Sequence, residues 1–199
     1  MGPDLTGAAT PGSTVTGLDP GAMPRRTIIL LAALAVITGC DEERPPADPG
    51  FNDTDVMFLQ MSIEYARQGD EVAALAESRG GTPEVRTLAT GLRTQWDTES
   101  GTMRRWLLGW QRPLTADPGA HAGHGDHSLR PSDLAELRAT KAADFDRTAL
   151  TLLVGHLHNC VEVTRMESAG GRYPPAKALA ATMTQARQAD IQRMLKLLA

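Results

Sequence analysis

The sequence has few aromatic side chains, only two cysteines and no long apolar run. Aromatic residues make up 4% of the 199 residues, a composition that suits an Ala- and Leu-rich helical core better than an all-β one. Two cysteines, Cys40 and Cys160, are too few for a disulfide scaffold. The apolar run at 28–37 is far shorter than the about 20 residues that cross a bilayer. A formal net charge of −4 offers no basic face of the kind that binds nucleic acid.

The motifs of common enzyme classes are missing as well. The chain contains no glycine-rich phosphate loop, no CxxC pair and no Ser/His/Asp arrangement in an elbow context. A di-iron bundle would need two Glu-x-x-His motifs, and the sequence has neither. Cys160, four residues after His156, could be read as a nucleophile beside a base. Because a cysteine on the inner face of a helix is usually an inert core residue, we expect that the protein is not an enzyme.

What the sequence does contain is an internal duplication, at an offset of 91 positions and without a gap. Asp55 returns as Asp146, and conservative pairs such as Glu99 with Asp190 lie between the identical ones. Further identical pairs are Leu59 with Leu150, Glu71 with Glu162, Gly80 with Gly171, Pro83 with Pro174, Met103 with Met194, and Leu107 with Leu198. A repeat unit of this length is a supersecondary element that needs its twin to complete a core. The copies at 53–112 and 141–199 should therefore form one domain.

Each copy has the pattern of a helical hairpin. In the first copy, apolar positions at helical spacing predict a helix over about 53–78 and a second one that starts at Pro83 and ends before residue 113. Thr82 is the expected N-cap of that second helix, with Pro83 in its first turn. Gly80 and Gly81 form the turn, where glycine can take the left-handed conformation that ends a helix.

The second copy repeats this plan. It predicts a helix over about 141–168, a turn at Gly170-Gly171 and a last helix from Pro174 to the C-terminus. Two hairpins with one apolar stripe per helix give an all-α, four-helix bundle over 53–199. The linker at 113–140 should include a short helix opened by Ser132.

The leader has the marks of a bacterial lipoprotein signal. Arg25-Arg26 precede the apolar run, and Thr38-Gly39 lead directly to Cys40. This ending resembles a lipobox, in which the cysteine is diacylated and becomes the mature N-terminus. We therefore expect a signal peptide in residues 1–39, started more naturally at Met23 than at Met1, and a solvated tether over 40–52. The protein would be extracytoplasmic and attached to the bacterial membrane through lipidated Cys40; the alternatives are an uncleaved anchor or a coincidental Gly-Cys pair.

Two acids interrupt the apolar stripes of the second and fourth predicted helices. Glu99 lies between Trp96 and Met103, and Asp190 is followed at helical spacing by Met194. A buried carboxylate costs several kcal/mol unless it is paired or hydrogen-bonded, so each acid needs a partner. Counting outward from each turn brings Tyr65 to Glu99 and His156 to Asp190, and these pairs are the expected ones. The same count predicts that all four residues share one level of the bundle.

This polar layer allows two interpretations. Carboxylates and imidazoles that project inward from four helices are how bundles build metal sites, and thioether and thiolate ligands favour reduced copper. The candidate core ligands are His156, Asp190, Glu99, Met103 and Met194. The alternative is a set of satisfied hydrogen-bonded pairs among ordinary core methionines.

A second candidate metal site lies in the linker. His121, His124 and His127 fall within seven residues and are separated by glycines. Short histidine-rich tracts bind borderline metal ions such as Cu(II), Zn(II) or Ni(II). Binding should be modest and pH-dependent, because the imidazoles must be neutral and the loop is not preformed. The alternative is a solvated polar linker.

Four segments resemble the domain of unknown function 305 family. They are DVMFLQMSIEYARQ (55–68), QWDTESGTMRRWLL (95–108), FDRTALTLLVGHLHNCVEV (145–163) and QADIQRMLKLL (188–198). The resemblance covers about 53–199 and implies a ferritin-like bundle of two repeats, commonly exported by bacteria. Some members are periplasmic copper-binding proteins, which implies copper handling.

The chain departs from the family pattern at the histidines. The family carries a His-His pair on the first and third helices, and an acid followed by methionine on the second and fourth. The acids and methionines are present here, but Tyr65-Ala66 replaces the first His-His pair and His156-Leu157 keeps only half of the second. His158 is about 200° around the helix from His156 and should point away from the core.

Two functions remain open from the sequence. The first is an exported, lipid-anchored bundle that binds copper or zinc weakly, as a buffer or accessory in envelope metal homeostasis. The second is a degenerate family member that acts as a metal-free protein-interaction scaffold.

Overall fold

The computed structural model describes residues 50–116 and 129–199, which form five α-helices. The helices are α1 (Asp53–Arg79), α2 (Pro83–Gly109), α3 (Pro131–Ala139), α4 (Ala142–Gly170) and α5 (Pro174–Leu198). The predicted all-α class and the four long helices are confirmed. The predicted signal peptide, Cys40, the predicted tether up to residue 49 and the linker histidines lie outside the described residues. Among the helices described, none is both long and apolar enough to span a membrane.

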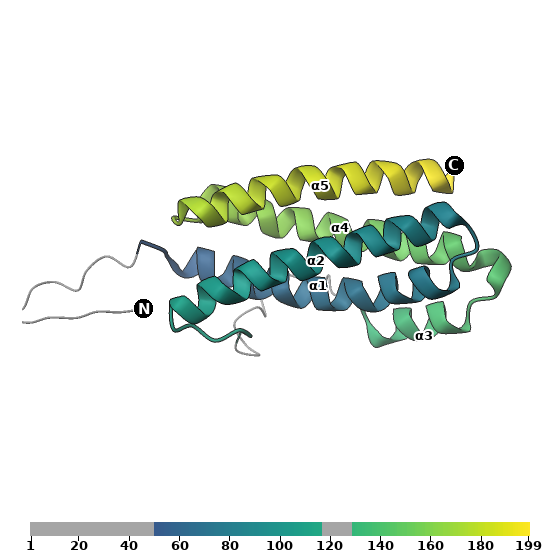
Figure 1. Cartoon of the computed structure of the whole chain (residues 1–199), viewed down its shortest axis with the longest axis horizontal. Helices are drawn as coiled ribbons and strands as arrows, with labels where there is room; N and C mark the ends of the chain where they lie inside the picture. Colours follow the sequence, from purple (N-terminus) through teal and green to yellow (C-terminus); the bar gives the residue numbers. More distant parts are fainter. Residues whose placement is uncertain (1–49, 117–128) are drawn as a thin grey trace, which may run out of the picture. The chain divides into compact units, whose positions relative to one another are not determined.

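The long helices pack as two hairpins. α1 packs against α2 and α4 against α5, and the hairpins meet mainly through α1 and α4 (Figure 1). The short helix α3 lies against α1 and α4. Arg79 at the end of α1 holds this connection, because its guanidinium donates to the carbonyl oxygens of Arg138 and Thr140 at 2.9 Å each and lies over the Phe145 ring.

The predicted helix starts follow from their capping residues. The Asn52 side chain accepts from the Asp55 backbone N–H at 3.0 Å, and the Asp55 carboxylate accepts from the Asn52 N–H in return. Thr82 is the N-cap of α2, as predicted, and Pro83 stands in its first turn. For α3 the predicted position is slightly wrong: its N-cap is Arg130, and Pro131, not Ser132, opens the helix.

The turn glycines do not adopt the left-handed conformation that we expected. Gly80 has φ −52° and Gly171 has φ −67°, values that any residue can adopt. Space explains these two glycines better than backbone freedom. A Cβ atom on Gly80 would collide with the Ala76 carbonyl oxygen, and one on Gly171 would collide with the Glu167 carboxyl group.

The duplicated aspartates join the two hairpins reciprocally. The Asp146 carboxylate on α4 accepts from the backbone N–H groups of Gly81 and Thr82, at 2.7 and 3.0 Å, in the turn between α1 and α2. The equivalent Asp55 on α1 accepts from the N–H groups of Arg172 and Tyr173, at 3.0 and 2.8 Å, in the turn between α4 and α5. The two turns therefore lie at opposite ends of the bundle, as Figure 1 shows.

The core follows the predicted stripes and is largely apolar on either side of the middle of the bundle. Fully buried side chains include Leu59, Leu107, Leu150 and Leu153. At mid-height of the bundle the aliphatic packing gives way to polar and aromatic side chains. That layer contains most of the residues that the sequence singles out.

Candidate functional site

A buried polar cluster lies halfway along the bundle. We define it by six residues, contributed by all four long helices: Tyr65, Trp96, Glu99, His156, Cys160 and Arg187. All are less than one-tenth exposed. Tyr65 and His156 are equivalent positions of the two repeats, and so are Trp96 and Arg187, since each pair is 91 residues apart.

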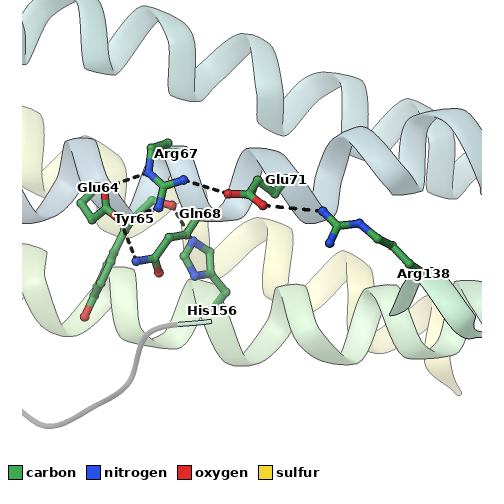
Figure 2. Close-up of polar contacts among 7 residues, drawn as sticks. All are labelled: Glu64, Tyr65, Arg67, Gln68, Glu71, Arg138 and His156. Atoms are coloured by element: carbon green, nitrogen blue, oxygen red, sulfur yellow. Dashed lines mark hydrogen bonds and ion pairs between the residues drawn. The ribbon is translucent and has the colours of Figure 1, made fainter. Parts of the chain in front are cut away.

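His156 is held by the backbone of α1. Its Nε2 atom lies 2.9 Å from the carbonyl oxygen of Tyr65, as Figure 2 shows. A carbonyl oxygen can only accept, so Nε2 carries the proton and donates. Burial, and to a smaller extent the Arg187 charge, lower the pKa of the imidazole to about 4, although the Tyr65 hydrogen bond opposes both. His156 is therefore neutral at pH 7, and its Nδ1 atom has no hydrogen-bond partner among the described residues.

Cys160 lies one helical turn from His156, on the same face as predicted. Its Sγ atom is 3.8 Å from His156 Nε2. Burial raises the pKa of this thiol to about 12, although the nearby Arg187 guanidinium lowers it in part. A thiol with such a pKa stays protonated at neutral pH, and the sequence expectation of an inert core cysteine is consistent with this environment.

Glu99 pairs with Arg187, and not with Tyr65 as the sequence count suggested. The Arg187 Nη2 atom donates to Glu99 Oε2, and the side chains are 1% and 9% exposed. Burial raises the pKa of Glu99, and the guanidinium opposes that rise. Arg187 also lies over the Trp96 ring, 5.8 Å from its centroid. The guanidinium is thus a positive charge inside the core.

Asp190 does not meet His156 either. Its carboxylate is 3.5 Å from Arg193 on the same helix, and that arginine is 72% exposed. Burial raises the pKa of Asp190, while Arg187 and Arg193 oppose the rise. The two methionines of the predicted ligand set, Met103 and Met194, are fully buried in the apolar core.

The opposite ends of the two turns explain why Glu99 and Asp190 do not share one level of the bundle. Counting from the turns places residues at one depth only where the turns lie at the same end, and here they lie at opposite ends. Equivalent residues of the two repeats then lie at the same depth only at the midpoints of the helices. Tyr65 and His156 occupy the midpoints of α1 and α4, and Trp96 and Arg187 those of α2 and α5. Glu99 and Asp190 lie one turn away from the midpoint in opposite directions. Arg187 stands between them and reaches Glu99.

The histidines outside this cluster take different positions. His158 is exposed on α4, as predicted. His121, His124 and His127 fall in the segment 117–128, outside the described residues. Within 50–116 and 129–199, no group of three or more His, Cys, Asp or Glu side chains is placed to hold a metal ion.

A groove runs between α2 and α5, which pack less closely than the other neighbours. It has a volume of ≈ 870 Å³. Its lining is mostly apolar and includes charged side chains from both helices. The lining includes Leu88, Leu92, Ala186, Ala189, Asp190 and Arg193.

A family model, described as the domain of unknown function DUF305, matches residues 55–198. The chain belongs to the DUF305 family. This assignment confirms the resemblance drawn from the quoted segments. No curated protein matches the chain.

Solved structures of other DUF305 proteins share this fold. A DUF305 fragment from Deinococcus radiodurans is 20% identical, with a TM-score of 0.67 over 75% of this chain and 98% of its own. A Streptomyces coelicolor DUF305 protein, described as a candidate secreted protein, is 20% identical, with a TM-score of 0.68 over 73% and 91%. CopM in its Cu(I)-bound form is 19% identical, with a TM-score of 0.61 over 72% of this chain and 94% of its own. CopM also has a Cu(II)-bound form.

The side chains in the core of this chain do not fit a bound copper ion. Glu99, one of the predicted ligands, is already neutralised by Arg187. A cation beside that guanidinium would meet a like charge in a medium of low dielectric constant. His156 donates its Nε2–H to the Tyr65 carbonyl oxygen, so only Nδ1 could ligate a metal ion.

Sequence reasoning missed Arg187 and the role of Trp96. A signal was present, because Arg187 falls at the buried stripe position where the first copy has Trp96. A charged residue at a position that is apolar in the twin repeat predicts an internal partner, and Glu99 was the unpaired acid in reach.

Proposed function

We propose that this chain is an exported, lipid-anchored DUF305 protein that binds copper weakly and serves as a buffer or accessory in envelope metal homeostasis. The observation that carries the proposal is the shared fold with CopM, which has Cu(I)- and Cu(II)-bound forms. The proposed role is binding and not catalysis.

Copper is assigned to the linker histidines His121, His124 and His127. Three imidazoles spaced by glycines can close around one borderline ion. The core is not assigned a copper ion, because Glu99 is paired with Arg187 and His156 is hydrogen-bonded to the Tyr65 carbonyl oxygen. The bundle would thus act as the carrier of a peripheral metal-binding segment, and Cys40 as its attachment to the membrane.

A copper titration of the unlipidated chain tests this assignment. The protein is produced with Cys40→Ser, and Cu(II) and Zn(II) binding are followed by calorimetry at pH 7.5 and pH 5.5. We expect His121/His124/His127→Ala to lose most of the binding, and His156→Gln to retain it. Binding should weaken at pH 5.5, because the imidazoles protonate. Equal binding by the triple variant and the parent would contradict the assignment.

The attachment to the membrane has its own test. Expressed in a bacterium, the parent chain should fractionate with membranes and be released by detergent, and Cys40→Ser should appear in the soluble extracytoplasmic fraction. Membrane retention of the serine variant would contradict lipidation at Cys40.

The metal-free scaffold remains the second candidate, and the groove between α2 and α5 favours it. Its mostly apolar lining would suit a helical segment of a partner protein. If no variant or parent binds copper or zinc, this candidate replaces the first. Leu88→Asp and Leu92→Asp would then be the variants to compare in partner capture from envelope extracts.

A further inference from the structure

The buried guanidinium of Arg187 stands among the side chains that could ligate a metal ion in this core. It pairs with Glu99 on α2 and lies over the Trp96 ring. Its charge acts on His156 and Cys160 of α4 and on Asp190 of its own helix α5. One cation, which the protein supplies itself, is therefore paired with Glu99 and acts electrostatically on three further ligand-type side chains.

We infer that Arg187 is the built-in cation of this core: it neutralises Glu99, fills the space between the helices, and excludes metal ions from the polar cluster. The charge argument is direct, because a buried carboxylate requires a cation or a proton. In a metal-binding bundle an ion supplies the positive charge. Here a side chain at the position equivalent to Trp96 supplies it. The inference concerns the core alone and does not depend on copper binding by the linker.

Two features support a permanent rather than an exchangeable cation. Arg187 is 1% exposed, so solvent does not compete for its charge. Guanidinium groups stay protonated in proteins, so Glu99 keeps its partner at any pH at which the bundle folds. A metal ion, in contrast, would dissociate on protonation of its ligands.

Removing the charge should convert the cluster into a soft-metal site. Arg187→Met deletes the cation, keeps an apolar body of similar length and adds a thioether. The variant leaves Glu99 unpaired beside His156 and Cys160, which are ligand types that favour monovalent copper or silver. The experiment is performed in the chain with Cys40→Ser and His121/His124/His127→Ala, so that silver retained by the linker does not obscure the result.

Silver retention and stability are measured together. Ag(I) is dialysed against each protein, and urea unfolding is followed with and without one equivalent of Ag(I). With Arg187 present we expect no retained silver and no change of the urea midpoint. Arg187→Met should retain one silver ion, unfold at higher urea when the ion is bound, and lose the ion when His156→Gln or Cys160→Ser is added. Arg193→Met is the matched control: it removes the exposed arginine beside Asp190 and should behave like the parent.

The counter-ion role is tested by removing the charges of Glu99 and Arg187 together and comparing the stability of that double variant with the single variant. In the absence of silver, Glu99→Gln/Arg187→Met should have a folding equilibrium constant at least tenfold higher than Arg187→Met alone, because it leaves no unpaired buried charge. A double variant no more stable than the single one would overturn the counter-ion role.

The exclusion role has equally clear contrary results. The exclusion role would be overturned if the Arg187-containing protein retained silver through His156 or Cys160. It would also be overturned if the Arg187→Met variant retained no silver. If Arg187→Met folds only with silver, the inference is supported. If it stays unfolded with silver while the double variant folds, a metal ion does not replace the guanidinium and the exclusion role fails. If neither variant folds, Arg187 acts through packing and the whole inference is wrong.

Discussion

Asp55 and Glu167 bring two carboxyl groups together where the start of α1 meets the end of α4. Both residues are fully buried. Asp55 accepts backbone N–H groups from Arg172 and Tyr173, whereas neither oxygen of Glu167 accepts a hydrogen bond from the described residues. Burial, and then the hydrogen bond and charge of Asp55, raise the pKa of Glu167 to about 8. Glu167 is therefore the protonated member of the two acids.

Glu167 should make the bundle less stable in alkaline solution. Its pKa is about 8 in the folded chain and near the ordinary glutamate value of 4.5 in the unfolded chain. The stabilising contribution is therefore complete below pH 4.5 and is lost as the pH rises through 8. We expect the parent to lose about 2–4 kcal/mol of unfolding free energy between pH 5 and pH 9 relative to Glu167→Ala. Urea unfolding across this range measures the difference.

The duplication supplies the control for this prediction. The position equivalent to Glu167 in the first repeat is Ala76, which is also fully buried, and there the Asp146 carboxylate meets its turn without a second acid. Glu167→Ala thus makes the second junction resemble the first. Glu162→Ala, which removes an exposed acid paired with Arg165 on the same helix, should keep the pH dependence of the parent. Identical profiles for Glu167→Ala and the parent would contradict the assigned protonation.

His156 should limit stability in acid. Its pKa is about 4 in the folded chain, against the ordinary histidine value of 6.5 in the unfolded chain. Below pH 6.5 the unfolded chain takes up a proton that the folded chain does not, so stability is full above pH 6.5 and falls as the pH drops toward 4. His156→Gln should flatten this decline by about 2–3 kcal/mol. His158→Gln, at an exposed position two residues away, should leave the decline unchanged, and chemical unfolding between pH 4 and pH 7.5 distinguishes the two.

The fold could be predicted from the sequence because helix caps and apolar stripes are local signals. The duplication shows in addition that the two hairpins are equivalent. Asn52, Thr82 and Pro174 mark helix starts through contacts within one turn, and the apolar stripes identify the buried faces without knowledge of the partner. The reciprocal clamps of Asp55 and Asp146 could not be predicted in the same way, because they join segments that only the three-dimensional arrangement brings together.

The polar cluster was predicted only in part of its members and not in its pairings. Glu99, His156 and Cys160 were identified from their positions on apolar stripes. Their partners depend on whether the two turns lie at the same or at opposite ends of the bundle, which helical periodicity does not determine. Arg187 was overlooked because an arginine in a helix is usually an exposed residue.

Cys160 should be unreactive while the bundle is folded. It is 7% exposed, and burial raises the pKa of its thiol to about 12. In the chain with Cys40→Ser it is the single thiol. We expect modification by Ellman's reagent at pH 8 to be at least 100-fold slower in buffer than in 8 M urea, since the thiolate is the reactive form. Rapid native modification would show that the helices open at this level far more often than the packing implies.

Gly69 should be required for the polar cluster to close. This glycine is equivalent to Cys160 in the duplication, and a Cβ atom at its position would lie 2.6 Å from Trp96 Cη2 and 2.7 Å from His156 Nε2. Both neighbours are buried rings, so Gly69→Ala must shift one of them, and the hydrogen bond from His156 to the Tyr65 carbonyl would lengthen. Overpacking of this kind costs about 1–3 kcal/mol, which should exceed the gain of about 1 kcal/mol in helix propensity.

Gly155→Ala provides the opposite expectation on the helix that carries His156. Nothing lies within 4 Å of a Cβ atom at Gly155, so only the helix propensity changes, and the variant should be more stable by about 0.5–1 kcal/mol. Urea unfolding of both variants at pH 7, followed by the fluorescence of the three tryptophans, separates propensity from packing. If Gly69→Ala were stabilised as much as Gly155→Ala, the rings of Trp96 and His156 would have room to move, and the tight packing that holds the imidazole on the Tyr65 carbonyl would not exist in solution.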